Sequence, residues 1–150
     1  MKHVLIVTAF LIAALSTQAQ SLLGLEDLMK NKVGAPFKIV FAHIMKQGQI
    51  DPAGSTLLAA QHVSAGLREG LLLAPSQLLD GGGQLKDEGS KIAFQGYQKG
   101  MQAMIVETDK LVVMLSVKSA DEGAQLQAIK EQVQIIIRAQ KQAHERFKDE

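Results

Sequence analysis

The chain has 150 residues, of which 47% are hydrophobic, so it is long and apolar enough to form one domain with a buried core, and intrinsic disorder is excluded. Its 16 Lys and Arg residues are balanced by 15 Asp and Glu residues, which excludes the strongly basic surface that nucleic acid binding needs. Cysteine is absent, so disulfides, thiolate metal sites and a lipid-modified N-terminal cysteine are excluded too.

Residues 1–19 are typical of a secretory signal peptide. A lysine near the start is followed by an apolar run over residues 4–15, and Thr17 and Ala19 stand at the small positions of a cleavage site. The apolar run is shorter than the about 20 residues that a membrane-spanning helix needs, so a retained anchor is the less favoured alternative. We therefore expect residues 20–150 to form a near-neutral domain that is exported to the periplasm and lies outside the membrane.

The composition favours an all-α protein, because Ala, Leu, Gln, Lys and Met are plentiful while aromatic residues make up only 4% of the chain. Gly34 and Pro36 interrupt the first predicted helix, and an interior Pro costs about 3 kcal/mol. The helix either bends there or gives way to a second one. Its apolar residues recur at helical spacing as far as Gly48 and are Leu22, Leu25, Met29, Val33, Val40 and Ile44.

A second helix is predicted to begin at Asp51, which resembles an N-cap followed by Pro52 in the first turn, and to end before Pro75. After it, Gly81, Gly82 and Gly83 predict a flexible connection. The apolar face expected for this helix consists of Leu57, Leu58, Val63, Leu67, Leu71 and Leu72.

Two further helices are predicted on either side of a break at residues 116–124. Gln140 is one polar residue in the otherwise apolar seam of the last helix. Four amphipathic segments with short connections predict an up-down-up-down antiparallel four-helix bundle. The third helix carries Ile92, Phe94, Tyr97, Met101, Met104, Ile105, Leu111 and Met114, and the fourth carries Leu126, Ile129, Val133, Ile136, Ala143 and Phe147.

In that topology the start of the first helix lies beside the end of the last. Met29 and His144 are then expected at the same level, both facing inward. A thioether and an imidazole that face each other across a bundle can be the axial pair of a haem, a ligand set that favours low-spin iron and electron transfer. Phe94 and Tyr97 are expected at the same end, where they could wall a flat macrocycle.

Spacing by itself leaves a simpler interpretation open. A Met on an apolar helix face is most often a core residue, and a single His near a helix C-terminus is commonly an exposed residue stabilised by the helix dipole. Gln140, one turn before His144, also suits a helix end that is open to water. On spacing alone, these simpler roles are more frequent than a haem site.

The stretch QKQAHERFK, residues 140–148, resembles the end of the cytochrome c prime family, whose last helix closes with two cysteines, the haem-ligating histidine, two variable residues, an aromatic residue and an arginine. His144 matches the histidine and Phe147 the aromatic residue, while Lys148 stands in place of the arginine. Gln140 and Ala143 occupy the cysteine positions, so covalent attachment is excluded.

The cytochrome b562 family has the same last helix without the cysteines and binds haem non-covalently. LEDLM, residues 25–29, is similar to the start of its first helix, where the methionine is the second axial ligand. The resemblance implies one haem b per chain, with Met29 and His144 as the iron ligands. It also implies a protein that is not an enzyme and that carries single electrons between redox partner proteins. Lys141 and Lys148 flank His144 and could meet the haem propionates, although basic residues at a helix end more often serve the dipole.

Two alternatives stay open. If the irregularity at Gly34 and Pro36 moves Met29 off the iron, the site would be five-coordinate, closer to the gas-binding character that the c prime resemblance implies. Otherwise the chain is a haem-free secreted bundle that kept the scaffold and acts as a binding or stress module. The sequence also leaves open whether the chain forms a homodimer.

The remaining candidate ligands favour simpler roles. His43 and His62 are expected near the turn between the first two helices, and two surface histidines are favoured over a metal site because a closed zinc site needs four donors. Flexible core packing is favoured over a copper site for four methionines, which are Met45, Met101, Met104 and Met114.

Overall fold

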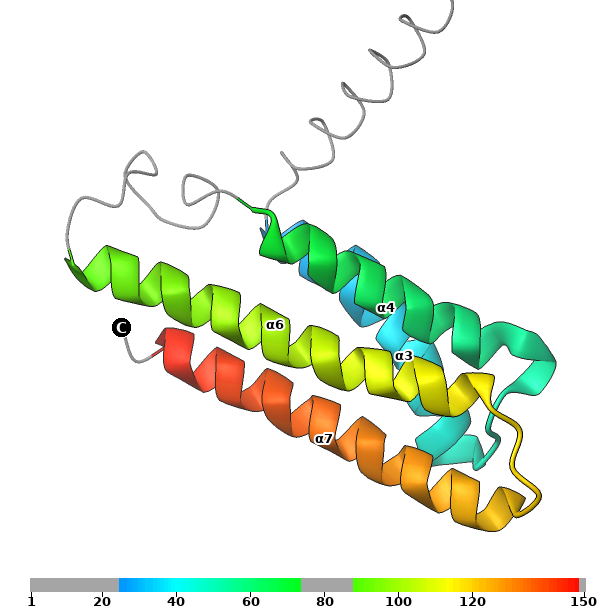
Figure 1. Ribbon diagram of the computed structural model, residues 1–150. Coiled ribbons are helices and arrows are strands. Elements are labelled where there is room, and N and C mark those ends of the chain that lie inside the picture. Colours follow the sequence, from blue (N-terminus) through cyan, green and yellow to red (C-terminus); the bar gives the residue numbers. More distant parts are fainter. Residues whose placement is uncertain (1–24, 74–87, 149–150) are drawn as a thin grey trace, which may run out of the picture.

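The computed structural model describes residues 25–73 and 88–148, and within these ranges the chain is helical with no strand, so the expected all-α class is confirmed. Four helical units pack against one another (Figure 1). None of the described helices is both long and apolar enough to cross a membrane. The expected signal peptide and the connection at Gly81 to Gly83 lie outside the described residues. The first unit joins α2 (Leu25–Leu28), η1 (Met29–Gly34), α3 (Ala35–Phe41) and η2 (Ala42–Gln47), and the others are α4 (Ser55–Leu71), α6 (Glu88–Ser116) and α7 (Glu122–Lys148).

The irregularity expected at Gly34 and Pro36 is a π-helical turn, η1. The backbone stays right-handed at Leu28, Gly34 and Ala35, and the N–H of Ala35 donates to the carbonyl of Lys30, five residues back. Pro36, which has no N–H, lies in the first turn of α3. The chain therefore continues through a widened turn as one helical unit and does not start a separate helix at the proline.

The connection from the first unit to α4 is short and capped. The first unit ends at Gly48, whose φ of 64° is in the left-handed region that favours glycine. The carboxylate of Asp51 accepts hydrogen bonds from two backbone N–H groups in the first turn of α4, at 2.8 and 3.2 Å. The side chain of Asp51 therefore caps the helix start as expected, but its predicted N-cap position is wrong. α4 begins at Ser55 with Gly54 as its N-cap, and Pro52 lies in a separate 3₁₀ turn, η3 (Pro52–Gly54).

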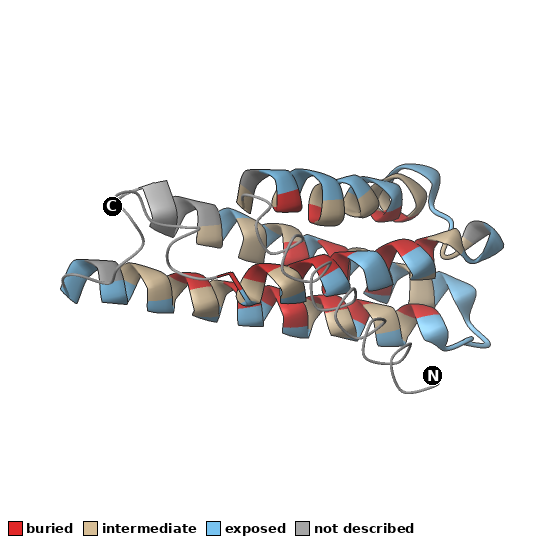
Figure 2. Ribbon diagram, turned by 90° about the horizontal axis from the view of Figure 1, so that it is seen from above, coloured by how far each residue is buried: buried red, intermediate tan, exposed pale blue. Residues whose placement is uncertain are grey.

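Buried residues lie on the faces that the helices turn toward one another (Figure 2). Their side chains form two apolar clusters. Burying each large aliphatic side chain stabilises the fold by about 1.5–3 kcal/mol. Cluster A consists of Val40, Ile44, Ala59, Ala60, Leu111, Leu115, Ile129, Val133 and Ile136. Cluster B consists of Leu28, Val33, Val63, Leu67, Tyr97, Met101, Met104 and Ile105.

Three residues expected on apolar faces are instead exposed. Leu58 is 54% exposed and Leu72 is 80% exposed, because their neighbours Leu57 and Leu71 pack inward and consecutive helical residues point about 100° apart. Ile92 is 54% exposed, since it lies in the opening turns of α6 before that helix reaches cluster B at Tyr97. For these three residues the sequence prediction was wrong.

Candidate functional site

The candidate site lies at the end of the bundle that contains cluster B. Met29, in η1, is half-buried and packs against this cluster. Ala139 of α7, far from Met29 in the sequence, packs against the same cluster. Met101 and Met104 are buried members of the same cluster, as expected for core residues. Met29 of the first unit and Ala139 of α7 thus both border cluster B.

The side chain of Tyr97 is buried and held by a hydrogen bond at this end of the bundle. Its side chain is 5% exposed, and its hydroxyl group donates a hydrogen bond of 2.6 Å to the backbone carbonyl of Gly70. Burial raises the pKa of Tyr97 to about 12, so the hydroxyl stays protonated and uncharged over the physiological range. The ring of Phe94 stacks on that of Tyr97 with 6.5 Å between centroids and 20° between planes. Phe94 and Tyr97, which the sequence analysis placed together at this end, are therefore in direct ring contact.

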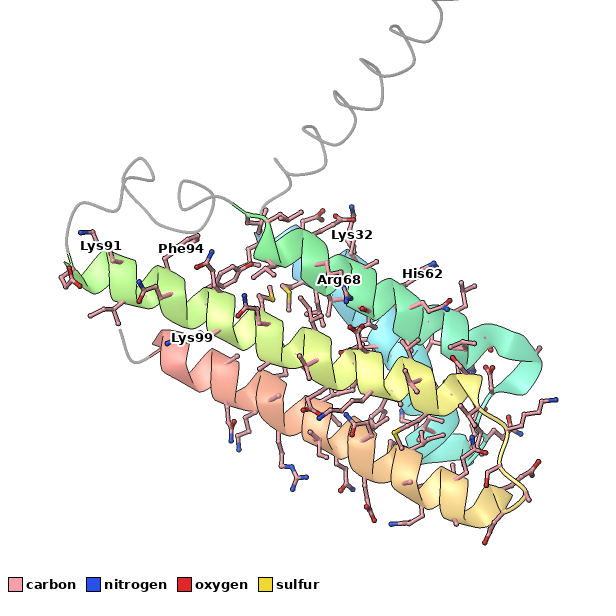
Figure 3. All side chains as sticks on the ribbon, viewed as in Figure 1. Lys32, His62, Arg68, Lys91, Phe94 and Lys99 are labelled. Atoms are coloured by element: carbon pink, nitrogen blue, oxygen red, sulfur yellow. The ribbon has the colours of Figure 1, made fainter. Side chains whose placement is uncertain are left out.

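The last turns of α7 lie against α6 one turn beyond Tyr97. A Cβ atom placed on Gly100 would lie 3.6 Å from the Cβ of Ala143, which is ordinary van der Waals contact. Lys99, next to this contact, is seen beside the last turns of α7 in Figure 3. The backbone of residue 144 follows directly in α7, whereas the side chains of His144, Phe147 and Lys148 lie outside the described residues.

The described residues fit a haem in their chemistry. The macrocycle is flat and largely apolar, and this end offers aliphatic side chains, an aromatic pair and a half-buried thioether, Met29. Soft sulfur is a suitable ligand for low-spin haem iron. Which of these groups would touch a haem depends on the end of α7, where the predicted nitrogen ligand belongs.

The other two described histidines have separate environments. The Nδ1 atom of His43 lies 2.9 Å from the hydroxyl of Thr56, a residue that is fully buried at the start of α4, and His62 is exposed. Among the described side chains, which exclude those of residues 144–148, no three His, Asp or Glu residues gather closely enough to hold a metal ion.

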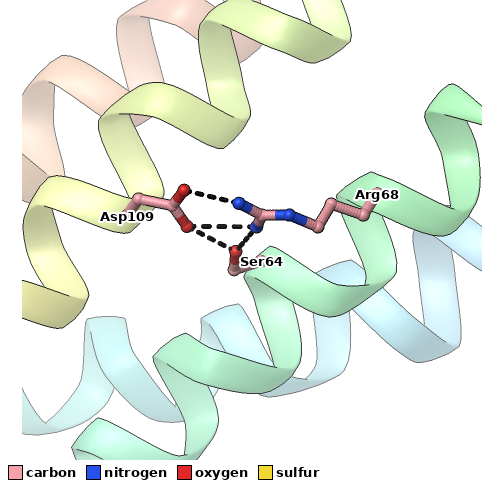
Figure 4. Close-up of polar contacts among 3 residues, drawn as sticks. All are labelled: Ser64, Arg68 and Asp109. Atoms are coloured by element: carbon pink, nitrogen blue, oxygen red, sulfur yellow. Dashed lines mark hydrogen bonds and ion pairs between the residues drawn. The ribbon is translucent and has the colours of Figure 1, made fainter.

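A polar network between α4 and α6 escaped the sequence analysis (Figure 4). The guanidinium of Arg68 donates to both carboxylate oxygens of Asp109, at 2.7 and 3.1 Å, and the hydroxyl of Ser64 donates to the same carboxylate at 2.6 Å. Arg68 lowers the pKa of Asp109 by this hydrogen bonding. The pair is 41 positions apart on exposed helix faces, where single-chain periodicity carries no signal of pairing. The network joins α4 and α6.

A second missed residue is Gln132, which is 7% exposed inside the seam of α7. Its amide nitrogen donates at 2.8 Å both to the backbone carbonyl and to the carboxylate of Glu107 on α6. A hydrogen bond from Lys110, and in second place the one from Gln132, lowers the pKa of Glu107. The sequence marked Gln140 as the polar exception in this seam, and that residue is half-buried. Beside Gln132 a shallow groove is lined by Val106, Asp109, Lys110, Val113 and Met114.

No family model, no curated protein and no solved structure matches this chain. The resemblance to four-helix-bundle cytochromes therefore rests on the stretches QKQAHERFK and LEDLM and on the helical layout. Beyond the sequence, the structure describes the packing around Met29, Phe94 and Tyr97 and the course of the α7 backbone.

Proposed function

We propose that this chain is a periplasmic b-type cytochrome, an up-down-up-down antiparallel bundle that binds one haem b non-covalently between Met29 and His144. It would transfer single electrons between redox partner proteins without chemistry on a substrate. The haem supplies a redox-active iron, and the protein supplies the ligands, the apolar walls and the exclusion of water.

The order of residues in the two clusters supports the antiparallel topology. The first unit contributes Leu28 and Val33 to cluster B and later residues to cluster A, whereas α4 contributes to cluster A first and to cluster B through Val63 and Leu67. The third unit, α6, again contributes to cluster B first, and α7 contributes to cluster A before Ala139 reaches cluster B. Successive units therefore traverse the two clusters in opposite order.

Two similar residue counts carry the proposal. A Cβ atom on Gly48 would lie 3.9 Å from the side chain of Leu126, so the end of the first unit meets the start of α7. Met29 lies 19 residues before Gly48, and His144 lies 18 residues after Leu126. At about 1.5 Å of rise per residue, α7 extends about 27 Å from Leu126 to position 144. The first unit is shorter than this rise would give, because η1 and η2 are π-helical turns, which rise less per residue than an α-helix. Similar residue counts from a shared contact favour the same end of the bundle for both predicted ligands.

The register of α7 favours the same arrangement. Val133 and Ile137 follow Leu126 at steps of seven and four residues, and position 144 follows at a further step of seven. Residues at these steps share one helix face. Because Leu126 meets the first unit at Gly48, this spacing favours position 144 on the face of α7 that is turned toward the first unit.

Each residue would have a distinct role in this site. The sulfur of Met29 and an imidazole nitrogen of His144 would hold the iron, and Phe94 and Tyr97 would pack against the macrocycle. Phe147, one turn after the histidine, would cover another edge, and Lys148 would meet a propionate. Packed helices would hold both ligands in fixed positions, and the haem would supply the redox-active iron for electron transfer.

A titration with hemin tests the proposal. We expect the purified domain to give a sharp Soret band and split α and β bands on reduction. The chain has one Tyr and no Trp, so quenching of Tyr97 fluorescence reports binding at this end of the bundle. A spectrum of free haem with unquenched tyrosine would overturn the proposal and favour the haem-free binding or stress module.

Substitutions distinguish the proposed iron ligands from a methionine that only packs against the core. His144→Ala should abolish tight binding, and Met29→Ala should convert a low-spin reduced spectrum into a high-spin one. Met45→Ala is the matched control, because Met45 packs against cluster A, and it should leave the spectrum unchanged. An unaltered spectrum in Met29→Ala would mean that the sulfur is not a ligand and that the iron site is of the five-coordinate kind or uses another residue.

A further inference from the structure

The outer side of α6 carries an apolar stripe that the described helices leave exposed. Its three valines are between 52% and 62% exposed, and they are Val106, Val113 and Val117. Together with Lys110 they recur at steps of four, three and four residues, which places them on one helix face. Valine is a weaker helix former than alanine, so at exposed positions it contributes little to the stability of the helix or of the core. Apolar side chains gathered on one exposed face mark an interaction surface.

The stripe borders the shallow groove that Gln132 of α7 helps to line. α6 and α7 lie side by side here (Figure 1), and the amide of Gln132 donates to the carboxylate of Glu107 at 2.8 Å. Ile135, one turn after Gln132, is also exposed. The same surface therefore offers a ridge along α6 and a hollow beside it. A second copy of the chain presents both features in return, which suits a two-fold contact between identical surfaces.

We propose that this face of α6 and α7 pairs with the same face of a second copy of the chain, with the two α6 helices antiparallel. The proposal does not depend on haem binding. It gives the homodimer that the sequence left open a specific interface, with the three valines at its centre.

Two lysines on the stripe decide the direction of the pairing. Lys99 precedes Val106 by steps of four and three residues through Ala103, so it continues the face to which Lys110 belongs. In a parallel pair each of these lysines would face its own counterpart, and like charges set against each other are unfavourable. Charged or polar residues in a helical seam fix its direction and register in this way.

One antiparallel register keeps the lysines apart. When Val106 faces Lys110 of the second copy, Ala103 faces its Val113 and Lys99 faces its Val117. A small side chain then meets a larger one, and each lysine can lay its aliphatic stem over a valine while its ammonium group stays in water. A shift that brings Ala103 onto Val106 would set Lys99 against Lys110.

In this register Lys110 lies between two carboxylates. Its ammonium group is 2.9 Å from Glu107 of its own chain. Because it faces Val106 of the second copy, it also comes next to the Glu107 that follows that valine. The two-fold symmetry repeats this arrangement, so two lysines and two glutamates of opposite charge meet near the centre.

Lys99 comes close to the acidic start of α7 in the second copy. It faces Val117, whose backbone carbonyl accepts a hydrogen bond from the side-chain amide of Gln125 in the first turn of α7. This start carries Asp121 and Glu122 against one basic residue, Lys118, and is net acidic. Opposite charges across the interface would favour the antiparallel register and speed the encounter of two copies.

Sedimentation equilibrium of the purified exported protein without haem, from about 1 μM to 1 mM, tests the proposal. We expect an equilibrium of monomer and dimer. Val113→Glu puts two carboxylates into the seam of a symmetric dimer and should raise the dissociation constant by about tenfold or more. Leu58→Glu is the matched control, because Leu58 is exposed on α4, and it should leave the dissociation constant unchanged. Circular dichroism should show that both variants are folded.

A charge exchange tests the register. Lys99→Glu should weaken the dimer, because the new carboxylate meets Asp121 and Glu122 of the second copy. Glu122→Lys should weaken it as well, whereas the protein with both substitutions should recover. A double variant that dimerises no better than either single variant would overturn this register.

The distance between two spin labels tests the direction. The chain has no cysteine, so a label on Ile92→Cys is unique. Ile92 lies 16 residues from position 108, the centre of the proposed register, so the two labels should be about 48 Å apart at about 1.5 Å per residue. A parallel pair would keep them near the spacing of packed helices, about 8–10 Å.

Two outcomes would overturn the dimer itself. One is a monomer at the highest concentration, which would leave this face to a different partner protein. The other is a Val113→Glu variant that dimerises as well as the unaltered protein, which would move the interface elsewhere.

Discussion

Tyr97 of α6 and Gly70 of α4 are joined by a buried hydrogen bond of 2.6 Å from the phenol to the backbone carbonyl. Gly70 has no side chain, and a Cβ atom there would lie 3.3 Å from the Tyr97 hydroxyl and 2.6 Å from the Met101 methyl group. The glycine therefore makes room for both residues at the end of the bundle where the haem is proposed. The bond ties the start of α6 to the last turn of α4.

Tyr97→Phe should destabilise the domain at neutral pH. The substitution leaves the Gly70 carbonyl without its donor while keeping the ring, and a typical buried hydrogen bond contributes about 0.5–1.5 kcal/mol. Urea denaturation followed by circular dichroism at pH 7 measures the difference. A variant as stable as the unaltered protein would show that the hydrogen bond makes no net contribution.

The same variant should alter the dependence of stability on alkaline pH. Because burial raises the pKa of Tyr97 from 10.0 to about 12, the folded state keeps a proton that the unfolded state releases. The part of the free energy of unfolding that comes from the protonated Tyr97 hydroxyl is fully present below pH 10. It is lost between pH 10 and about 12, by at most about 1.4 kcal/mol per pH unit. Tyr97→Phe should lack this decline, so its disadvantage should shrink when denaturation is repeated at pH 11.

Gly66→Ala should destabilise the packing of α4 on the first unit. The added Cβ would lie 2.6 Å from the backbone carbonyl oxygen of Lys32, so a helix has to shift. Overpacking of this kind typically costs about 1–3 kcal/mol. Gly96→Ala is the control: it meets nothing within 4 Å and should gain up to about 1 kcal/mol from helix propensity. Opposite signs in chemical denaturation are expected, and equal effects would contradict the close approach at Gly66.

Asp109→Asn should weaken the link between α4 and α6 by a small amount. The side chains of Arg68 and Asp109 are 52% and 43% exposed, so solvent screening limits their coupling to about 0.5–1 kcal/mol in a double-mutant cycle with Arg68→Gln. Because the pKa of Asp109 is lowered below 3.8, its contribution is present above that value and is lost as the pH falls through the lowered pKa. The stability difference measured at pH 7 should therefore disappear in acid, and persistence there would refute the ionic origin.

Asp51→Ala should destabilise the start of α4 by about 0.5–2 kcal/mol, the usual effect of losing a helix cap. The carboxylate accepts two backbone N–H groups at 2.8 and 3.2 Å, and alanine would leave both without this acceptor. Asp51→Asn keeps an acceptor oxygen and should retain most of the stability. Thermal unfolding of the two variants checks the order, and equal destabilisation of both would show that the charge of Asp51, and not its hydrogen bonds, is decisive.

Local features of the sequence determined the helical content. The helix expected from Asp51 to before Pro75 is found at Ser55–Leu71, and the seam of Ile129, Val133 and Ile136 is buried as predicted. Spacing of apolar residues, a capping carboxylate and helix-breaking residues act within one or two turns. They can therefore be read from a single chain. For the same reason the sequence located the irregularity at Gly34 and Pro36.

Only the tertiary structure decided how that irregularity is resolved and which polar residues pair. Val33 lies against Gly66 and Leu28 lies against Gly70, and both contacts depend on a partner helix more than 30 residues away along the chain. The bonds from Tyr97 to Gly70 and from Arg68 to Asp109 likewise join residues 27 and 41 positions apart. Periodicity describes which face of a helix is buried, but contact partners depend on how separate faces meet in three dimensions.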